Sequence, residues 1–173
     1  MRIDPERIAI GGISAGGGLI ASLGLLARDR GEVSVKFQIL LQPMLDDRHA
    51  TDDYDHPFAG EYLWRKQYNH FGWSALLGHE PGADGVSAYA SASRAESLVG
   101  SPSTFINVGA IDLFVEESIE YAQRLIRDGV PTELHVYPGA CHAFQAIAPV
   151  SAVAKANDRD LTTALRRALF PAD

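Results

Sequence analysis

Ser14 lies in the glycine-rich stretch GGISAGG, between a short apolar run and a longer one. The spacing Gly12-x-Ser14-x-Gly16 is typical of a nucleophile elbow, a sharp strand-to-helix turn that holds a serine in a strained backbone conformation. Side chains at the two glycine positions would collide with the returning backbone, so the pattern favours glycine at both. The backbone N–H of Ala15, at the start of the helix, would point at a developing oxyanion. The stretch therefore predicts Ser14 as a nucleophile.

Asp112 and His142 are the candidate partners of such a serine, which needs a base to accept its proton and an acid to orient the base. Asp112 follows the apolar run STFINVG by three residues, and His142 follows ELHVYPG by three. If both runs are parallel strands, their carboxyl ends lie at one edge of a sheet and the side chains converge there. Taken separately, Asp112 would also suit a cap of the following helix, and His142 an ordinary loop. Together with the elbow, they predict a Ser–His–Asp triad.

A second interpretation of the same stretch is a dinucleotide-binding loop. Residues 16–21, GGGLIA, match the pattern G-x-G-x-x-A after a strand and at the start of a helix. Asp46 follows the second apolar run, where a ribose-binding acid would be expected. However, the first glycine of this fingerprint should form the turn that leaves the strand, and Gly16 lies four residues beyond Gly12. The dinucleotide interpretation is therefore the less favoured one.

The elements that must position these residues follow from hydrophobic patterning. Short apolar or β-branched runs without polar alternation are typical of strands buried on both faces. Strands that alternate with helices predict an α/β fold, a parallel sheet with helices on both faces. Residues 44–98, between the second and third strands, are predicted to form one long excursion. The predicted strands are residues 7–12, 35–43, 103–109 and 132–139, and the predicted helices are residues 15–28, 61–70, 114–128 and 151–169.

The bulk composition predicts a single domain over residues 1–173 that binds neither nucleic acid nor membranes. The formal net charge of −7 opposes binding to phosphate backbones and anionic membrane surfaces. The N-terminus lacks the layout of a signal peptide, and the single cysteine, Cys141, excludes an internal disulfide and a thiolate zinc site. We therefore expect a cytoplasmic protein without metal or cofactor. The acidic loop DDRHATDDYDHPF holds His49 and His56 but lacks a regular ligand spacing, so it is predicted to be solvated.

Three stretches of the chain resemble the hormone-sensitive-lipase-like esterases, the α/β-hydrolase fold-3 group of acetyl esterases and lipases. They are RIAIGGISAGGGLIA, QPMLDDR and the run over residues 87–144 that contains GAIDLF and PGACHAF. The resemblance implies a partial α/β-hydrolase fold and the hydrolysis of short-chain carboxylic esters. It also implies Ser14 as nucleophile, His142 as general base and Asp112 as orienting acid.

The chain also departs from that family's pattern. Ile13 stands where the family's elbow usually has aspartate, and the chain begins at the strand that enters the elbow, without the H-G-G-G motif that completes the family's oxyanion hole. We therefore expect Ala15 N–H as the one certain oxyanion donor, and a reduced activity. We further expect the exposed strand 7–12 to pair in a homo-oligomer, because an open apolar edge invites pairing. The alternative is a weakly active or non-catalytic hydrolase module whose main property is oligomerisation.

Overall fold

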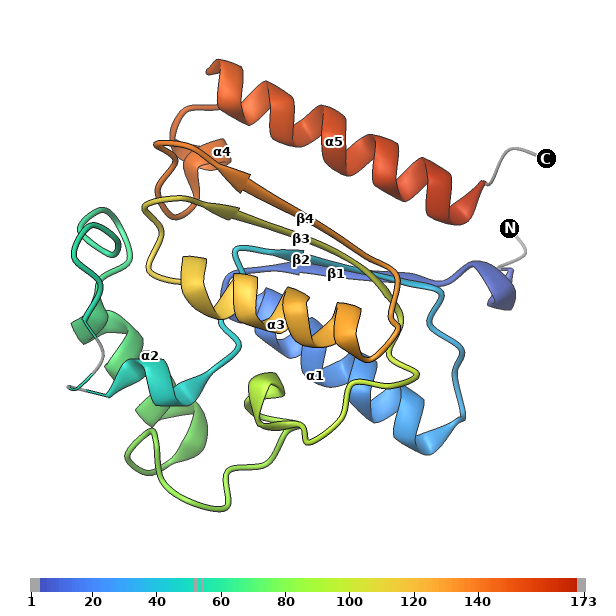
Figure 1. Cartoon of the computed structure of the whole chain (residues 1–173), viewed down its shortest axis with the longest axis horizontal. Helices are drawn as coiled ribbons and strands as arrows, with labels where there is room; N and C mark the ends of the chain where they lie inside the picture. The colour runs from blue at the N-terminus through green and yellow to red at the C-terminus, as the bar shows by residue number, and fades with distance from the viewer. Residues whose placement is uncertain (1–3, 52, 54, 171–173) are drawn as a thin grey trace.

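A parallel sheet of four strands lies at the centre of the molecule (Figure 1). The computed structural model describes residues 4–51, 53 and 55–170. The strands are β1 (Ala9–Ile13), β2 (Phe37–Leu41), β3 (Ser103–Gly109) and β4 (Thr132–Tyr137). The α-helices are α1 (Ala15–Arg30), α2 (Lys66–Leu77), α3 (Val115–Arg127), α4 (Phe144–Ile147) and α5 (Ala152–Leu169), and the short 3-10 helices are η1 (Pro5–Arg7), η2 (Asp47–Ala50) and η3 (Ala92–Arg94).

The strands follow one another across the sheet in the order β1-β2-β3-β4, and all three pairs are parallel. α1 and α3 pack on one face of the sheet, and α5 packs on the opposite face (Figure 1). The predicted α/β fold, with four parallel strands and helices on both faces, is therefore confirmed. Because the strands are parallel, all four carboxyl ends lie along one edge of the sheet.

Each predicted strand is present, although three of them are shorter than the patterns suggested. β3 has the predicted bounds, and all of its residues except Ser103 are buried. β2 ends at Leu41 because Gln42 adopts a φ of 45° and Pro43 has no N–H to donate to a ladder. β4 ends at Tyr137, where the chain turns through Gly139 at a φ of 69°.

Three of the four predicted helices are present within two residues of their expected bounds, and the short helix α4 was not predicted. α1 ends where Gly31, at a φ of 64°, donates its N–H to the Ala27 carbonyl oxygen. The helix predicted over residues 61–70 is wrong in its bounds, because Leu63 adopts a φ of 62° and helical geometry begins only at Lys66. In the described part of the chain, no helix is long and apolar enough to cross a membrane.

Apolar layers on both faces hold the sheet in place. On the α1 and α3 face, Leu40 and Ile106 of the sheet pack with Leu25 of α1 and Leu125 of α3, and none of these side chains is appreciably exposed. On the other face, the smaller cluster around Phe37 and Phe105 packs against α5; the α5 members are Leu161, Ala164, Leu165 and Ala168. Apolar packing against the helices on both faces of the sheet thus fixes the strand ends relative to one another.

The segment between β2 and β3 contains α2 and two short 3-10 helices, and no strand in its described residues. Trp73 of α2 is fully buried, and it belongs to the same apolar cluster as Leu113 and Phe114, which directly follow Asp112. This cluster holds α2 beside the carboxyl edge of the sheet, where Figure 1 shows it apart from α1 and α3.

Candidate active site

Ser14, Asp112 and His142 meet at the carboxyl edge of the sheet. The Nε2 atom of His142 lies 3.0 Å from Oγ of Ser14, and its Nδ1 atom lies 2.9 Å from Oδ2 of Asp112. Asp112 and His142 are buried, whereas Ser14 is partly exposed. The imidazole thus connects a buried carboxylate to the hydroxyl of a partly exposed residue. Such an arrangement can remove a proton from the serine as it attacks an electrophile.

The turn at Ser14 has the strained geometry that a nucleophile elbow requires. Ser14 has φ 58° and ψ −125°, and its carbonyl oxygen accepts the N–H groups of Gly18 and Met44. A Cβ at Gly12 would lie 2.3 Å from the carbonyl oxygen of Gly16, so glycine is required there. At Gly16 a Cβ would meet no described atom within 4 Å. The expected collision therefore holds for the first glycine of the pattern and is wrong for the second.

The remaining glycines of this stretch are used for close packing. A Cβ at Gly18 would lie 2.0 Å from the carbonyl oxygen of Met44, and one at Gly17 would lie 2.9 Å from Cβ of Pro43. The chain after β2 therefore occupies the space that these glycines leave open. Asp46, the candidate ribose-binding acid, is buried and bonded to Arg48. Neither observation favours the dinucleotide-binding interpretation.

Both carboxylate oxygens of Asp112 have a polar partner. One carboxylate oxygen contacts His142, and the other accepts the backbone N–H of Phe114 at 3.1 Å, directly before α3. The contact with His142 and the bond to Phe114 thus use different oxygens of one side chain, although Asp112 is not the N-cap of α3, which is Phe114. The second bond fixes the rotamer of the carboxylate, which orients it toward the imidazole.

Two aromatic rings flank His142, and no pattern in the sequence predicted either contact. The ring of Phe114, fully buried, meets the imidazole edge-on with centroids 5.3 Å apart. The indole of Trp64 lies 6.2 Å from the imidazole at an angle of 37° between the planes. Trp64 belongs to the segment before α2, where no periodic pattern relates it to His142.

Gln42 holds the loop that carries His142, and no pattern in the sequence predicted this role. Its side-chain oxygen accepts the N–H of Ala143 at 2.7 Å, and its amide nitrogen donates to Oε1 of Gln145 at 2.9 Å. Gln42 is fully buried, and Ala143 has a φ of 55°, an uncommon conformation for a residue with a side chain. The loop after β4 is therefore tied to the end of β2.

Ala15 is the first residue of α1, so its N–H is one of those that have no acceptor within the helix. It is exposed and directly follows Ser14. This N–H lies at the positive end of the helix dipole, where a developing negative charge is stabilised.

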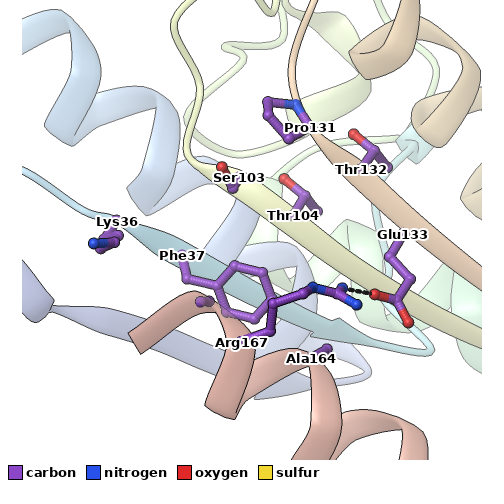
Figure 2. Close-up of a pocket in the computed structure, with 10 residues that line it drawn as sticks. Lys36, Phe37, Ser103, Thr104, Pro131, Thr132, Glu133, Ala164 and Arg167 are labelled. Carbon is purple, nitrogen blue, oxygen red and sulfur yellow. Dashed lines mark hydrogen bonds and ion pairs between the residues drawn. The ribbon is translucent and has the colours of Figure 1, made fainter. Parts of the chain in front are cut away.

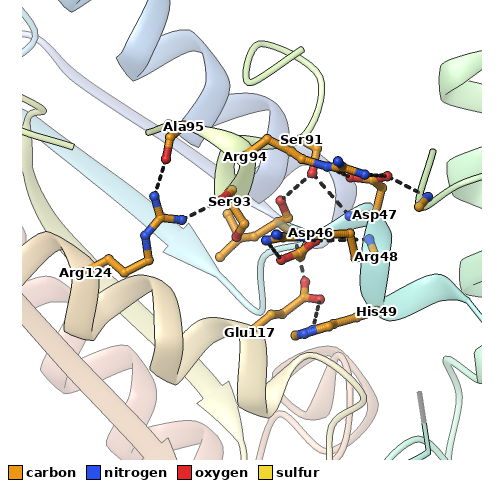
Figure 3. Close-up of polar contacts among 12 residues, drawn as sticks. Asp46, Asp47, Arg48, His49, Ser91, Ser93, Arg94, Ala95, Glu117 and Arg124 are labelled. Atoms are coloured by element: carbon orange, nitrogen blue, oxygen red, sulfur yellow. Dashed lines mark hydrogen bonds and ion pairs between the residues drawn. The ribbon is translucent and has the colours of Figure 1, made fainter. Parts of the chain in front are cut away.

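The acidic residues after β2 are not solvated as predicted, because two arginines pair with them (Figure 3). Asp47 is fully buried and accepts two bonds from Arg94, at 2.8 and 2.7 Å. Asp46 is also buried and forms a similar pair with Arg48. Of the same loop, Asp52 and Tyr54 lie outside the described residues. The expectation of a solvated loop is thus wrong for its first two carboxylates, which anchor the segment to its neighbours.

Glu117 of α3 is buried beneath this segment (Figure 3). It accepts the N–H of Leu45 at 2.7 Å, and its other oxygen lies 3.2 Å from Nδ1 of His49. Burial raises the pKa of Glu117 to about 7, despite the opposing effect of His49. Burial alone would lower the pKa of His49, but the bond and charge of Glu117 raise it above its usual value.

A cavity of about 310 Å³ lies between the sheet and α5 (Figure 2). Its lining includes Lys36 and the first residues of β3 and β4, so it lies at the amino ends of the strands, opposite Ser14. The Thr132 hydroxyl already donates to the Val130 carbonyl oxygen, and Arg167 is paired with Glu133 (Figure 2). This cavity is separate from the candidate active site.

A parallel α/β sheet with a serine on a strand-to-helix elbow, and a histidine and an aspartate after later strands, defines the α/β-hydrolase class. The Abhydrolase_3 family, described as alpha/beta hydrolase fold, matches residues 1–146. The chain belongs to this family, and the resemblance inferred from the sequence is confirmed.

Individual relatives agree with this assignment. The chain is 34% identical to the carboxylesterase NlhH of Mycobacterium tuberculosis over 172 residues, which cover 96% of the chain and 52% of the relative. Among solved structures, a bacterial heroin esterase is 41% identical with a TM-score of 0.87, covering 96% of this chain and 53% of that one. The esterase LipW of Mycobacterium marinum is 33% identical with a TM-score of 0.84, covering 97% and 52%. The chain therefore spans about half the length of the relatives it matches.

Proposed function

We propose that this chain hydrolyses short-chain carboxylic esters through Ser14, His142 and Asp112. The observation that carries the proposal is the continuous contact from the Ser14 hydroxyl through the His142 imidazole to the Asp112 carboxylate, at 3.0 and 2.9 Å. Membership of a family whose matched relatives include named carboxylesterases and esterases supports the choice of an ester as substrate.

In the proposed reaction, Oγ of Ser14 attacks the ester carbonyl carbon while Nε2 of His142 accepts its proton. The negative charge on the former carbonyl oxygen is stabilised by Ala15 N–H. The imidazolium then donates the proton to the leaving alcohol, and an acyl-enzyme forms. Water repeats the sequence, with His142 as base, and releases the acid. Asp112 holds the imidazole in the required tautomer and stabilises its positive charge throughout.

The rate should be modest if Ala15 provides the principal oxyanion donor. The loss of one donor from an oxyanion hole costs on the order of 10²- to 10³-fold in kcat. A second donor from another copy or segment would restore this stabilisation. We therefore expect turnover of activated esters, such as p-nitrophenyl acetate, to be the most readily measured activity.

The test compares p-nitrophenyl acetate turnover by the wild-type chain and by Ser14→Ala. We expect the variant to lose at least about 10³-fold in kcat, since removal of a triad nucleophile has effects of this order or greater. A fluorophosphonate probe should label the wild type stoichiometrically and should not label Ser14→Ala or His142→Ala. Equal turnover by wild type and Ser14→Ala would contradict the proposal. Absence of labelling in well-folded wild type would favour the non-catalytic alternative.

We further propose that the chain forms a homo-oligomer through the outer edge of β1. Ile13 of β1 and Leu19 and Leu23 of α1 are 41%, 55% and 45% exposed, so apolar side chains flank this edge. An unpaired strand edge also presents free backbone donors and acceptors. Light scattering at micromolar concentration should give at least a dimer, and the substitution Leu23→Glu should reduce it to a monomer. A monomeric wild type would contradict this part of the proposal.

A further inference from the structure

Trp64 contacts the candidate active site, but the proposed reaction of the three catalytic residues does not use it. It lies in the segment between β2 and α2, far from His142 in sequence, yet the two rings are 6.2 Å apart. On its other side, the indole lies 6.1 Å from the ring of Tyr68. The indole is only partly buried, so part of its surface is accessible.

Several local features hold the indole in this position. Leu63, directly before it, adopts a φ of 62°, a costly conformation for a bulky residue. The Trp64 backbone N–H donates to the Tyr62 carbonyl oxygen at 2.8 Å, and its indole N–H donates to the buried Asn69 side chain at 3.4 Å. The backbone of α2 comes close to the ring at Gly72, where a Cβ would lie 3.6 Å from it. The ring is thus fixed from several directions.

The chemistry of the triad determines which part of an ester would lie beside Trp64. In the proposed reaction, Nε2 of His142 donates its proton to the oxygen of the leaving alcohol. That oxygen must therefore lie within hydrogen-bond distance of the imidazole. A group attached to it, one or two bonds further away, is then close to a ring that packs against the same imidazole.

We propose that Trp64 is a specificity-determining residue that contacts the alcohol portion of the substrate, and that the site favours esters of aromatic alcohols. This inference rests on the proposed esterase function. Offset or edge-to-face aromatic pairs contribute about 0.5–1.5 kcal/mol in addition to the free energy gained by burying the same apolar area. That free energy corresponds to a preference of roughly 2- to 12-fold in kcat/KM over a saturated ring of the same size.

The test uses benzyl acetate and cyclohexylmethyl acetate, two esters whose alcohol portions have similar size and leaving-group basicity and differ in aromaticity. We expect the wild type to prefer benzyl acetate, and Trp64→Leu to lower this preference about 3- to 10-fold, mainly through KM. Trp64→Phe keeps an aromatic ring and should keep most of the preference. Thermal unfolding by circular dichroism checks that each variant is folded.

Two controls separate specificity from a structural role. Methyl phenylacetate and methyl cyclohexylacetate carry the same rings on the acyl side, and their ratio should not change in Trp64→Leu. Phe71→Leu removes a ring of α2 that is 72% exposed, and it should leave the benzyl preference unchanged.

The outcomes distinguish this inference from the function on which it rests. Turnover of both acetates with the same ratio in wild type and Trp64→Leu would overturn the role of Trp64 and leave the esterase proposal standing. An equal loss of kcat/KM for both acetates in Trp64→Leu would assign Trp64 a structural role and would also overturn the inference. Absence of wild-type turnover would overturn both proposals together.

Discussion

At the scale of single residues, the backbone at Ser14 is the least ordinary feature of the candidate site. A non-glycine residue at a φ of 58° is costly, and such strain persists only where the surroundings enforce it. Here the Ser14 N–H donates to the Leu41 carbonyl oxygen at 2.8 Å, and its own carbonyl oxygen accepts two N–H groups. The hydroxyl is thus held beside His142 by the backbone itself, which would reduce the reorganisation needed for the proposed reaction.

The two elbow glycines should respond differently to substitution. In Gly12→Ala the new methyl group would overlap the Gly16 carbonyl oxygen at 2.3 Å, so the turn must shift. We expect a loss of about 1–3 kcal/mol in unfolding free energy and a large loss of fluorophosphonate labelling. In Gly16→Ala the methyl group meets no described atom within 4 Å, and alanine favours the helix. We expect unchanged or slightly higher stability.

Urea unfolding of both glycine variants, with labelling of the folded proteins, checks this pair of expectations. Equal destabilisation by the two substitutions would show that some part of the assembled protein fills the space beside Gly16.

At the scale of elements, the candidate site depends on three loops that follow three different strands. β1 leads into the elbow, β3 into the segment with Asp112, and β4 into the loop with His142. Gln42, at the end of β2, connects to two of these regions through hydrogen bonds: it donates its backbone N–H to the Asn107 carbonyl oxygen of β3, and its side chain accepts the Ala143 N–H. The end of β2 therefore helps to fix the loop after β4.

Gln42→Ala should disturb this loop. The substitution leaves the Ala143 N–H without its acceptor, which costs about 1–3 kcal/mol if the group stays buried. A displaced imidazole should lower kcat by roughly 10- to 100-fold, with a smaller effect on KM, because proton transfer is sensitive to position.

Gln145→Ala is the matched control for Gln42→Ala. It removes the other partner of the Gln42 amide and leaves the bond to Ala143 in place. We expect a clearly smaller loss of kcat in steady-state assays. Similar losses in the two variants would show that the Ala143 bond does not position His142.

At the scale of the whole molecule, the segment between β2 and β3 joins the site to α3. The fully buried Asp47 and the partly buried Arg94 form a bidentate ion pair within this segment, and Glu117 links the segment to α3 through Leu45 and His49. Burial alone would raise the pKa of Asp47, but its bonds to Arg94, Gly82 and Ser91 lower it below its usual value. Breaking such a pair leaves an uncompensated charge and is strongly destabilising.

Glu117 should make the stability of the protein depend on pH near neutrality. Its pKa is about 7 in the folded protein and 4.5 in the reference state, so the folded protein retains a proton that the unfolded chain has lost. The stabilising contribution is complete below about pH 4.5 and is lost as the pH rises through 7. The raised pKa of His49 acts in the same direction.

Glu117→Gln cannot ionise and keeps an acceptor for the Leu45 N–H. As the pH rises from 5.5 to 7.5, the free energy of unfolding measured with urea should fall by on the order of 1–2 kcal/mol more in the wild type than in the variant. The sign of this difference follows from the upward shift of the Glu117 pKa. A wild type that gains stability relative to Glu117→Gln over this range would contradict the assignment of a raised pKa to Glu117.

Local patterns in the sequence were sufficient for the parallel sheet and for the proximity of Ser14, Asp112 and His142. Buried strands have recognisable apolar runs, and parallel strands bring their carboxyl ends to one edge regardless of the distance along the chain. Residues placed just after such runs are therefore predicted to meet. Their catalytic roles stay predictions until the substitutions proposed above are made.

The tertiary structure alone decided how the segment between β2 and β3 completes the site. The contact of Trp64 with His142, the bond from Gln42 to Ala143 and the burial of Asp46 and Asp47 all join groups distant in sequence, or depend on a path without periodic pattern. A side chain in an irregular segment has no preferred face, so its partners are set by long-range packing. For the same reason, the open space beside Gly16 could not be foreseen from the motif around Ser14.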